Sequence, residues 1–122
     1  MTKSKSGQGT RREKILKQYE ASLQLHEDTV DRLVDRLIKT GLYDTIDKHV
    51  QYKACGLCGE LDVKTTHYIN GVRYNHYYEV KSRDTQTARK TAKKQFRRYK
   101  FTHKDDAIKG IYVSPTRVQR LR

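Results

Sequence analysis

The sequence has little of what membrane-spanning, secreted or nucleotide-driven motor proteins need. Its 122 residues include one proline, two cysteines and no tryptophan, and only 34% of them are hydrophobic. No apolar run approaches the roughly 18 residues that cross a bilayer. The stretch Met1–Ser6 lacks the apolar segment of a secretory signal, and no phosphate-binding glycine loop of the G-x-x-x-x-G-K-[ST] type is present. Two cysteines are too few to staple a small secreted fold, so we expect an intracellular protein.

Acidic residues are scarce relative to basic ones. Lysine and arginine number 27 against 14 aspartates and glutamates, which gives a formal net charge of +13 at pH 7. Such a surface repels itself unless a polyanion neutralises it, so nucleic acid is the expected partner and a membrane is not. The length suits one domain, which we place at residues 11–122. Residues 1–10 are rich in Ser, Gly and Lys and predict a disordered basic arm.

The pattern of apolar and turn-forming residues predicts a mixed α/β (α+β) fold. Residues 11–40 lack Gly and Pro and carry apolar residues at helical spacing, which indicates one long helix, or two with a break near 25–29, ending at Gly41. Asn70-Gly71 between strand-like runs predicts a tight hairpin. The other expected elements are strands at 49–55, 61–69 and 72–80, a helix at 87–99 and a strand at 108–113. The resulting order is α-β-β-β-α-β, with a small mixed sheet flanked by helices.

The predicted hairpin brings charged side chains together. A two-residue turn pairs Ile69 with Val72, and the same register places Asp62 opposite Glu79, with Lys81 on the same face opposite Glu60. Opposed carboxylates repel one another unless a divalent cation binds between them, and Mg²⁺ accepts one or two carboxylates together with water and phosphate oxygens. The alternative is a solvated strand face with surface ion pairs. The opposite, apolar face would carry Leu61, Val63, Tyr78 and Val80.

These residues resemble a known nuclease pattern. Gly59-Glu-Leu-Asp62, followed by Tyr78-Glu79-Val-Lys81-Ser82, resembles the PD-(D/E)xK nuclease superfamily, and Gln95-Phe-Arg-Arg-Tyr99 is similar to the Q-x-x-x-Y motif of its RecB-type members. The resemblance covers roughly residues 25–115. It implies a restriction-endonuclease-like core and DNA phosphodiester hydrolysis dependent on Mg²⁺ or Mn²⁺. It also implies Asp62 and Glu79 as metal ligands and Lys81 and Gln95 as catalytic residues.

The sequence departs from the family pattern in two places. Leu61 stands where the proline of the motif would precede the aspartate, and the two cysteines are fewer than RecB-type members with an iron–sulfur cluster carry. Superfamily members usually add an acidic residue or a histidine from the first helix. At about 100° per residue, Glu27 borders the apolar stripe of residues 30–37. We therefore predict Glu27 as a third catalytic and metal-binding residue, with His26 and Asp31 as the next candidates.

The second predicted helix separates its charges from its apolar residues. Ala88, Ala92, Gln95, Phe96 and Tyr99 share the inward face. The opposite face holds six cations, and like charges four residues apart destabilise a helix unless they are neutralised. We predict that these cations bind DNA phosphates, and we include Tyr99 of the Q-x-x-x-Y motif in the DNA-binding set. The six cations are Arg89, Lys90, Lys93, Lys94, Arg97 and Arg98.

Several alternatives stay open at this point. Cys55 and Cys58 form a C-x-x-C pair that could bind zinc, although the register places His67 and His76 on the apolar face, away from it. The size and the end strand Ile111-Tyr-Val-Ser-Pro115 are similar to archaeal Holliday junction resolvases, whose symmetric cleavage implies a homodimer. A RecB-like exonuclease and a non-catalytic basic DNA-binding module are the competing functions.

Overall fold

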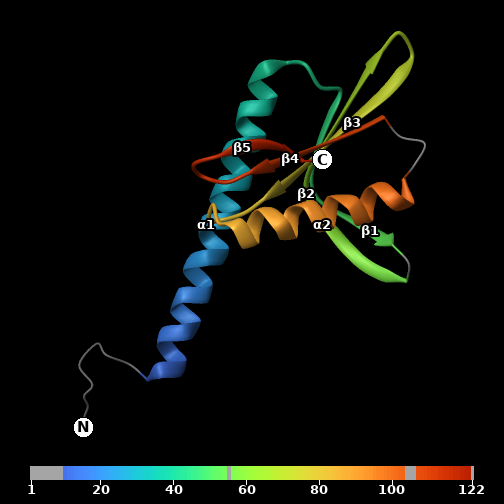
Figure 1. Cartoon of the computed structure of the whole chain (residues 1–122). Helices are drawn as coiled ribbons and strands as arrows, with labels where there is room; N and C mark the ends of the chain where they lie inside the picture. The colour runs from blue at the N-terminus through green and yellow to red at the C-terminus, as the bar shows by residue number, and fades with distance from the viewer. Residues whose placement is uncertain (1–9, 55, 104–106, 122) are drawn as a thin grey trace.

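The protein forms a five-stranded mixed sheet with one helix on each face. The computed structural model describes residues 10–54, 56–103 and 107–121. The elements are α1 (Arg11–Thr40), β1 (Thr45–Ala54), β2 (Leu57–Ile69), β3 (Val72–Val80), α2 (Gln86–Thr102), β4 (Ala107–Val113) and β5 (Val118–Leu121) (Figure 1). This arrangement confirms the predicted mixed class. It adds β5, in a basic segment without an apolar strand pattern.

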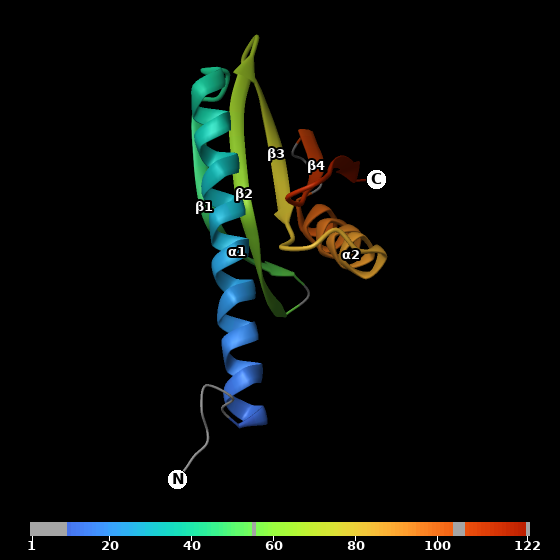
Figure 2. The ribbon, with the colours of Figure 1, turned by 90° about the vertical axis from the view of Figure 1, so that its left-hand side faces the viewer.

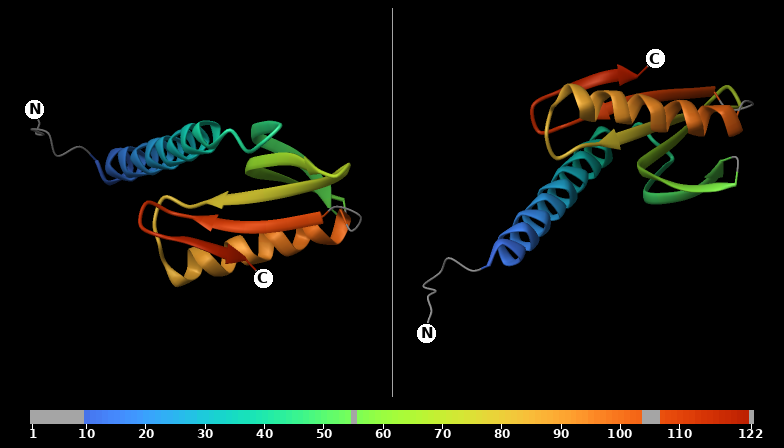
Figure 3. Two further views of the ribbon diagram at one scale, coloured as in Figure 1. Left: turned by 90° about the horizontal axis from the view of Figure 1, so that it is seen from above. Right: turned by 60° about the horizontal axis from the view of Figure 1, so that its bottom comes forward.

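The sheet follows chain order, β1-β2-β3-β4-β5. Neighbouring strands are antiparallel except β3 and β4, which are parallel. Parallel strands need a crossover connection, and α2 supplies it (Figure 3). Residues 1–9 of the predicted basic arm lie outside the described residues. No helix within the described residues is long and apolar enough to cross a membrane.

The hairpin forms at the predicted position. Asn70 and Gly71 have φ values of 51° and 79°, as the predicted two-residue turn requires. Its register runs from Ile69 opposite Val72 to Val63 opposite Tyr78. Within the described residues the pairing of β2 with β3 stops there, so Asp62 does not pair with Glu79 in the ladder.

The strand β2 changes faces beside Asp62. Pairing of β1 with β2 is continuous in register but passes over His49 and Asp62, and His49 has the left-handed φ of 54°. As a result Val63 packs on the α1 side of the sheet and Leu61 on the α2 side. The prediction that these two residues share a face is wrong, because the irregular backbone breaks the alternation of side chains between faces.

Each helix covers one apolar layer. The helix α1 is continuous, begins with a capping box between Thr10 and Glu13 and ends at Gly41, as predicted. Its second half packs on the sheet, whereas its first half extends beyond the sheet (Figure 2). The core on the α1 side contains Val30, Leu33, Leu37, Val63, Tyr78, Val80 and Val113. The core on the α2 side contains Tyr52, Leu61, Tyr77, Ala92, Phe96, Tyr99, Tyr112 and Leu121.

The glycine of the G-x-x-D segment has a packing role. A Cβ added to Gly59 would lie 2.4 Å from Cζ of Tyr52, which is shorter than any van der Waals contact. The absence of a side chain at Gly59 therefore lets the Tyr52 ring lie across β2 and reach the core on the α2 side.

Candidate active site

Asp62 and Glu79 meet where β2 leaves β3. The Asp62 side chain is 13% exposed, and its Oδ2 accepts a hydrogen bond of 2.7 Å from the backbone N–H of Val80. Glu79 is 2% exposed. The Asp62 carboxylate thus occupies the place of a ladder hydrogen bond beside Glu79. The two predicted carboxylates come together, although not through the predicted cross-strand pair.

Glu79 is a buried acid without a complete set of partners. Its Oε1 has no hydrogen-bond partner among the described residues. Burial, and then the charge of Asp62, raise the pKa of Glu79 to about 8, with Lys81 acting in the opposite direction and Glu60 in the same one. A buried carboxylate of this kind is costly to ionise unless a cation binds to it.

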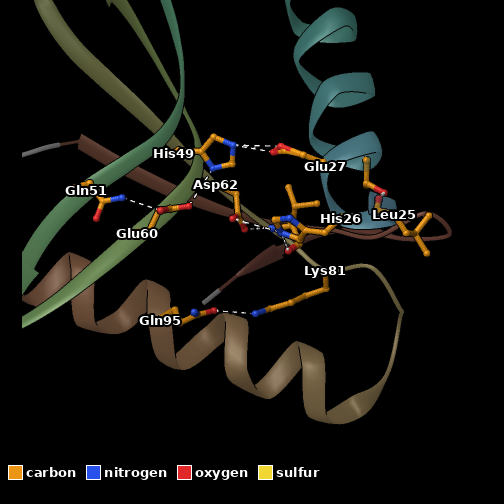
Figure 4. A network of polar contacts seen from close by, with 11 residues as sticks. Leu25, His26, Glu27, His49, Gln51, Glu60, Asp62, Lys81 and Gln95 are labelled. Atoms are coloured by element: carbon orange, nitrogen blue, oxygen red, sulfur yellow. Dashed lines mark hydrogen bonds and ion pairs between the residues drawn. The ribbon is translucent and has the colours of Figure 1, made fainter. Parts of the chain in front are cut away.

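The α1 contact to Asp62 comes from His26 rather than Glu27. The Nε2 of His26 lies 2.9 Å from the carbonyl oxygen of Val80 and 3.4 Å from Oδ1 of Asp62 (Figure 4). Hydrogen bonding to Asp62 is the main cause that raises the pKa of His26. The position of His26 could have been predicted from the sequence. At about 100° per residue, His26 lies in the middle of the apolar stripe of α1, and this stripe faces the sheet.

Glu27 belongs to a neighbouring chain of contacts. Its Oε1 lies 2.8 Å from Nε2 of His49, and Nδ1 of His49 lies 3.0 Å from Oε1 of Glu60. The amide of Gln51 donates to Glu60 over 2.7 Å (Figure 4). The contact with Glu60 is the main cause that raises the pKa of His49. The ranking of Glu27 first is therefore corrected, because its carboxylate is directed to β1.

His49 was not found from the sequence. Its position depends on a left-handed backbone inside a strand, which a histidine adopts rarely and which no local pattern indicates. Asp31, another candidate on α1, lies away from the site. Its side chain is 57% exposed and forms an ion pair of 3.0 Å with Lys48.

The helix α2 contributes Gln95 to the site. The ammonium of Lys81 donates a hydrogen bond of 3.1 Å to Oε1 of Gln95 (Figure 4). The prediction that Gln95 and Tyr99 face inward is confirmed. Tyr99 is 2% exposed, and its hydroxyl donates to the hydroxyl of Tyr77 over 2.8 Å. Its inclusion in the DNA-binding set is corrected, because a core side chain offers no surface to DNA.

The predicted cationic face of α2 is largely solvent-exposed. Lys90, Lys93, Lys94, Arg97 and Arg98 are exposed. Arg89 is half-buried and forms an ion pair of 2.7 Å with Asp84, which also pairs with Arg117 over 2.8 Å. Asp84, in the segment before α2, therefore links Arg89 of α2 to Arg117 in the turn before β5. Arg89 still lines a cavity of about 390 Å³, together with Lys90, Lys93 and Arg120.

The described residues do not contain a complete set of metal ligands. No group of three or more His, Cys, Asp and Glu among them is arranged to hold a metal ion. Cys55 lies outside the described residues, so the C-x-x-C prediction is not placed. His67 and His76 lie together in an aromatic cluster with ring centroids 5.2 Å apart, and burial lowers the pKa of His76 to about 4.

No protein-family model, curated protein or solved structure matches the chain.

Proposed function

We propose that the protein is a metal-dependent endodeoxyribonuclease of the PD-(D/E)xK type. The observation that carries the proposal is the buried Glu79, whose Oε1 lacks a partner among the described residues, beside the carboxylate of Asp62. Lys81 follows Glu79 by two residues and is held by Gln95 on α2. This order of groups on two strands and a helix is the one that the sequence motifs predict.

The donors at this position fit a divalent cation. Carboxylate oxygens are the ligands that Mg²⁺ and Mn²⁺ prefer, and Asp62 and Glu79 would hold the ion. A cation there would offset the cost of ionising Glu79. When bound, it would stabilise charge on the phosphate and lower the pKa of a coordinated water.

The other side chains have separate roles in the proposed reaction. Lys81 brings an ammonium beside the carboxylates, where it can donate to the attacking water or to a phosphate oxygen. Gln95 positions that ammonium by accepting a hydrogen bond from it. His26 and the Val80 N–H fix the orientation of Asp62. The exposed cations of α2 bind the phosphate backbone, with affinity that falls as salt rises.

A non-catalytic DNA-binding module is the second candidate. It is favoured by the absence of a group of three or more metal-ligating side chains within the described residues, and by the contacts that Asp62 already makes with Val80 and His26. A RecB-like exonuclease would use the same side chains and differs in needing a DNA end.

Cleavage of closed circular DNA separates these candidates. The purified protein is incubated with supercoiled plasmid, with the same plasmid linearised and with a four-way junction, in Mg²⁺, in Mn²⁺ and in chelator. We expect metal-dependent nicking of the circle that is lost in Asp62→Asn and Lys81→Ala and retained in Asp35→Asn, which changes an exposed acid on α1. Cutting of linear DNA alone would favour the exonuclease. Binding without any cutting would contradict the enzymatic proposal.

A further inference from the structure

A groove runs from Lys81 to the exposed half of α1. It has a volume of about 690 Å³ and lies between one face of α1 and the segment 81–88 at the start of α2. Ile15, Gln18 and Tyr19 form the α1 wall, and Lys81, Arg83 and Thr85 belong to the opposite wall. Because Lys81 lines the groove and also belongs to the candidate active site, the groove lies next to that site.

The walls of the groove combine two chemical properties. Among the described residues that line it, Lys81 and Arg83 are the charged ones, and both are positive. The α1 wall carries two exposed apolar side chains, Ile15 and Tyr19, which are 54% and 62% exposed, beside the polar Gln18 and Ser22. Cations opposite an exposed aromatic ring suit a ligand with both anionic groups and flat apolar faces.

We propose that this groove binds an unpaired polynucleotide strand, with its phosphates toward Lys81 and Arg83 and a base stacked on Tyr19. A paired duplex keeps its bases stacked inside, so it offers no free base to the tyrosine ring. An unpaired strand offers both a base face and phosphates, and base–aromatic stacking is the usual mode of binding such strands.

The substrate class inferred from the groove rests on the proposed nuclease function. Binding of a single strand in the groove does not depend on that function and can be measured separately. If the strand in the groove leads to Lys81, the substrate class is DNA with an unpaired segment next to the cleaved bond, such as a flap or a splayed arm. The projecting half of α1 then acts as a guide for that segment. Binding itself requires neither a metal nor cleavage.

The test measures binding in chelator by fluorescence anisotropy, with a labelled oligothymidylate of about 20 nucleotides and a paired duplex of the same length. We expect Tyr19→Ala to weaken binding of the single strand roughly 5- to 100-fold and to change duplex binding by less than about twofold. Tyr19→Phe should retain the affinity because it keeps the ring. An oligouridylate distinguishes a site that accepts RNA equally from one that selects DNA.

Two control variants test whether the loss of binding is specific to the groove. Tyr68→Ala removes a tyrosine that is 57% exposed at the far end of the hairpin, and Leu16→Ala removes an exposed apolar side chain of α1 that does not line the groove. Neither should affect single-strand binding. Equal losses in Tyr19→Ala and either control would overturn the inference. So would a shift from dimer to monomer in both Tyr19→Ala and Leu16→Ala, measured by sedimentation, because the exposed stripe would then bind a second copy.

A cleavage assay separates failure of this inference from failure of the proposed function. In Mg²⁺, Tyr19→Ala should lose more activity on a splayed-arm substrate than on supercoiled plasmid. If the protein cuts plasmid but Tyr19→Ala does not change single-strand binding, the proposed strand binding in the groove is wrong and the proposed nuclease function stands. If single-strand binding depends on Tyr19 but no DNA is cut, the proposed strand binding stands and the proposed nuclease function is wrong.

Discussion

The two carboxylates of the candidate site have different surroundings on the two sides of the sheet. On the α1 side, Asp62 accepts from the Val80 backbone and contacts His26, so its charge is already compensated. On the α2 side, Glu79 is 2% exposed, and its Oε1 has no hydrogen-bond partner among the described residues. One carboxylate is thus held by hydrogen bonds, while the other is buried with an oxygen that lacks a partner in the described part of the chain, and in the proposed function this oxygen would bind the cation together with Asp62.

Removing the charge of Glu79 should have the largest effect. We expect Glu79→Gln to lower DNA cleavage by at least roughly 10²- to 10³-fold, because the proposed metal loses a ligand. The same change should stabilise the metal-free protein at pH 8 by on the order of 1–3 kcal/mol, since a neutral amide replaces an acid that burial makes costly to ionise. Cleavage rates and urea unfolding measure the two effects. Full activity in Glu79→Gln would contradict the proposal that the carboxylate of Glu79 binds the metal.

The stability of the metal-free protein should fall as the pH rises. The pKa of Glu79 is raised to about 8 in the folded state, so between about pH 4.5 and pH 8 the folded protein keeps a proton that the unfolded chain has lost. The raised pKa of His26 acts in the same direction, because its contribution is complete below the unfolded pKa and is lost above the folded one.

This pH dependence is measurable by urea unfolding in chelator. We expect the free energy of unfolding to be lower at pH 8 than at pH 5.5 by on the order of 1–3 kcal/mol, because the pKa of His76, lowered to about 4, acts in the opposite direction and offsets part of the effect of Glu79. Addition of Mg²⁺ or Mn²⁺ at pH 8 should recover part of that loss, because a cation that binds only the folded state stabilises it. A stability that rises from pH 5.5 to pH 8 would contradict the assignment of a buried, protonated Glu79.

A smaller effect is expected on the α1 side. We expect His26→Gln to lower cleavage about 10-fold, because the backbone N–H of Val80 still holds Asp62 while the contact from α1 is altered. The pH dependence of stability should become shallower in the same variant. A loss as large as that of Asp62→Asn would show that His26 contacts the metal or the substrate rather than positioning Asp62.

The smallest effect concerns single cations on the exposed face of α2. Lys94→Ala should weaken DNA binding only a few-fold and reduce the dependence of log Kd on log salt by about one. Stability should be unchanged, since the side chain is exposed. Arg89→Ala is the informative contrast. It should also lower the unfolding temperature, because it breaks the ion pair with Asp84.

Local chemistry made part of the fold predictable. Asn70-Gly71 fixes the hairpin register because few residue pairs tolerate positive φ at two successive positions. Gly41 ends α1 for a similar reason, with φ of 66°. The strand β5 was not predicted, because its sequence Val-Gln-Arg-Leu has no distinct pattern and its pairing in the sheet is with β4, at the edge.

The details of the site depended on contacts between distant parts of the chain. The sequence predicts that Asp62 and Glu79 lie close together. It does not predict that β2 turns away from β3 at Val63, so that the two residues do not form a cross-strand pair. That turn coincides with the left-handed backbone of His49 on a third strand. The angular position of His26 was available from the sequence, yet its partner on β3 was visible only in the folded chain.

The shape of α1 also has a consequence for local unfolding. The helix is anchored at one end by Val30, Leu33 and Leu37, while its first turns rest on the cap at Thr10 and on their own backbone hydrogen bonds. A helical segment of that length is marginal in water without tertiary support. We therefore expect amide protection along α1 to rise from its exposed N-terminal half to the half that packs on the sheet. A ligand that contacts Tyr19 would have to order the least protected turns of this helix.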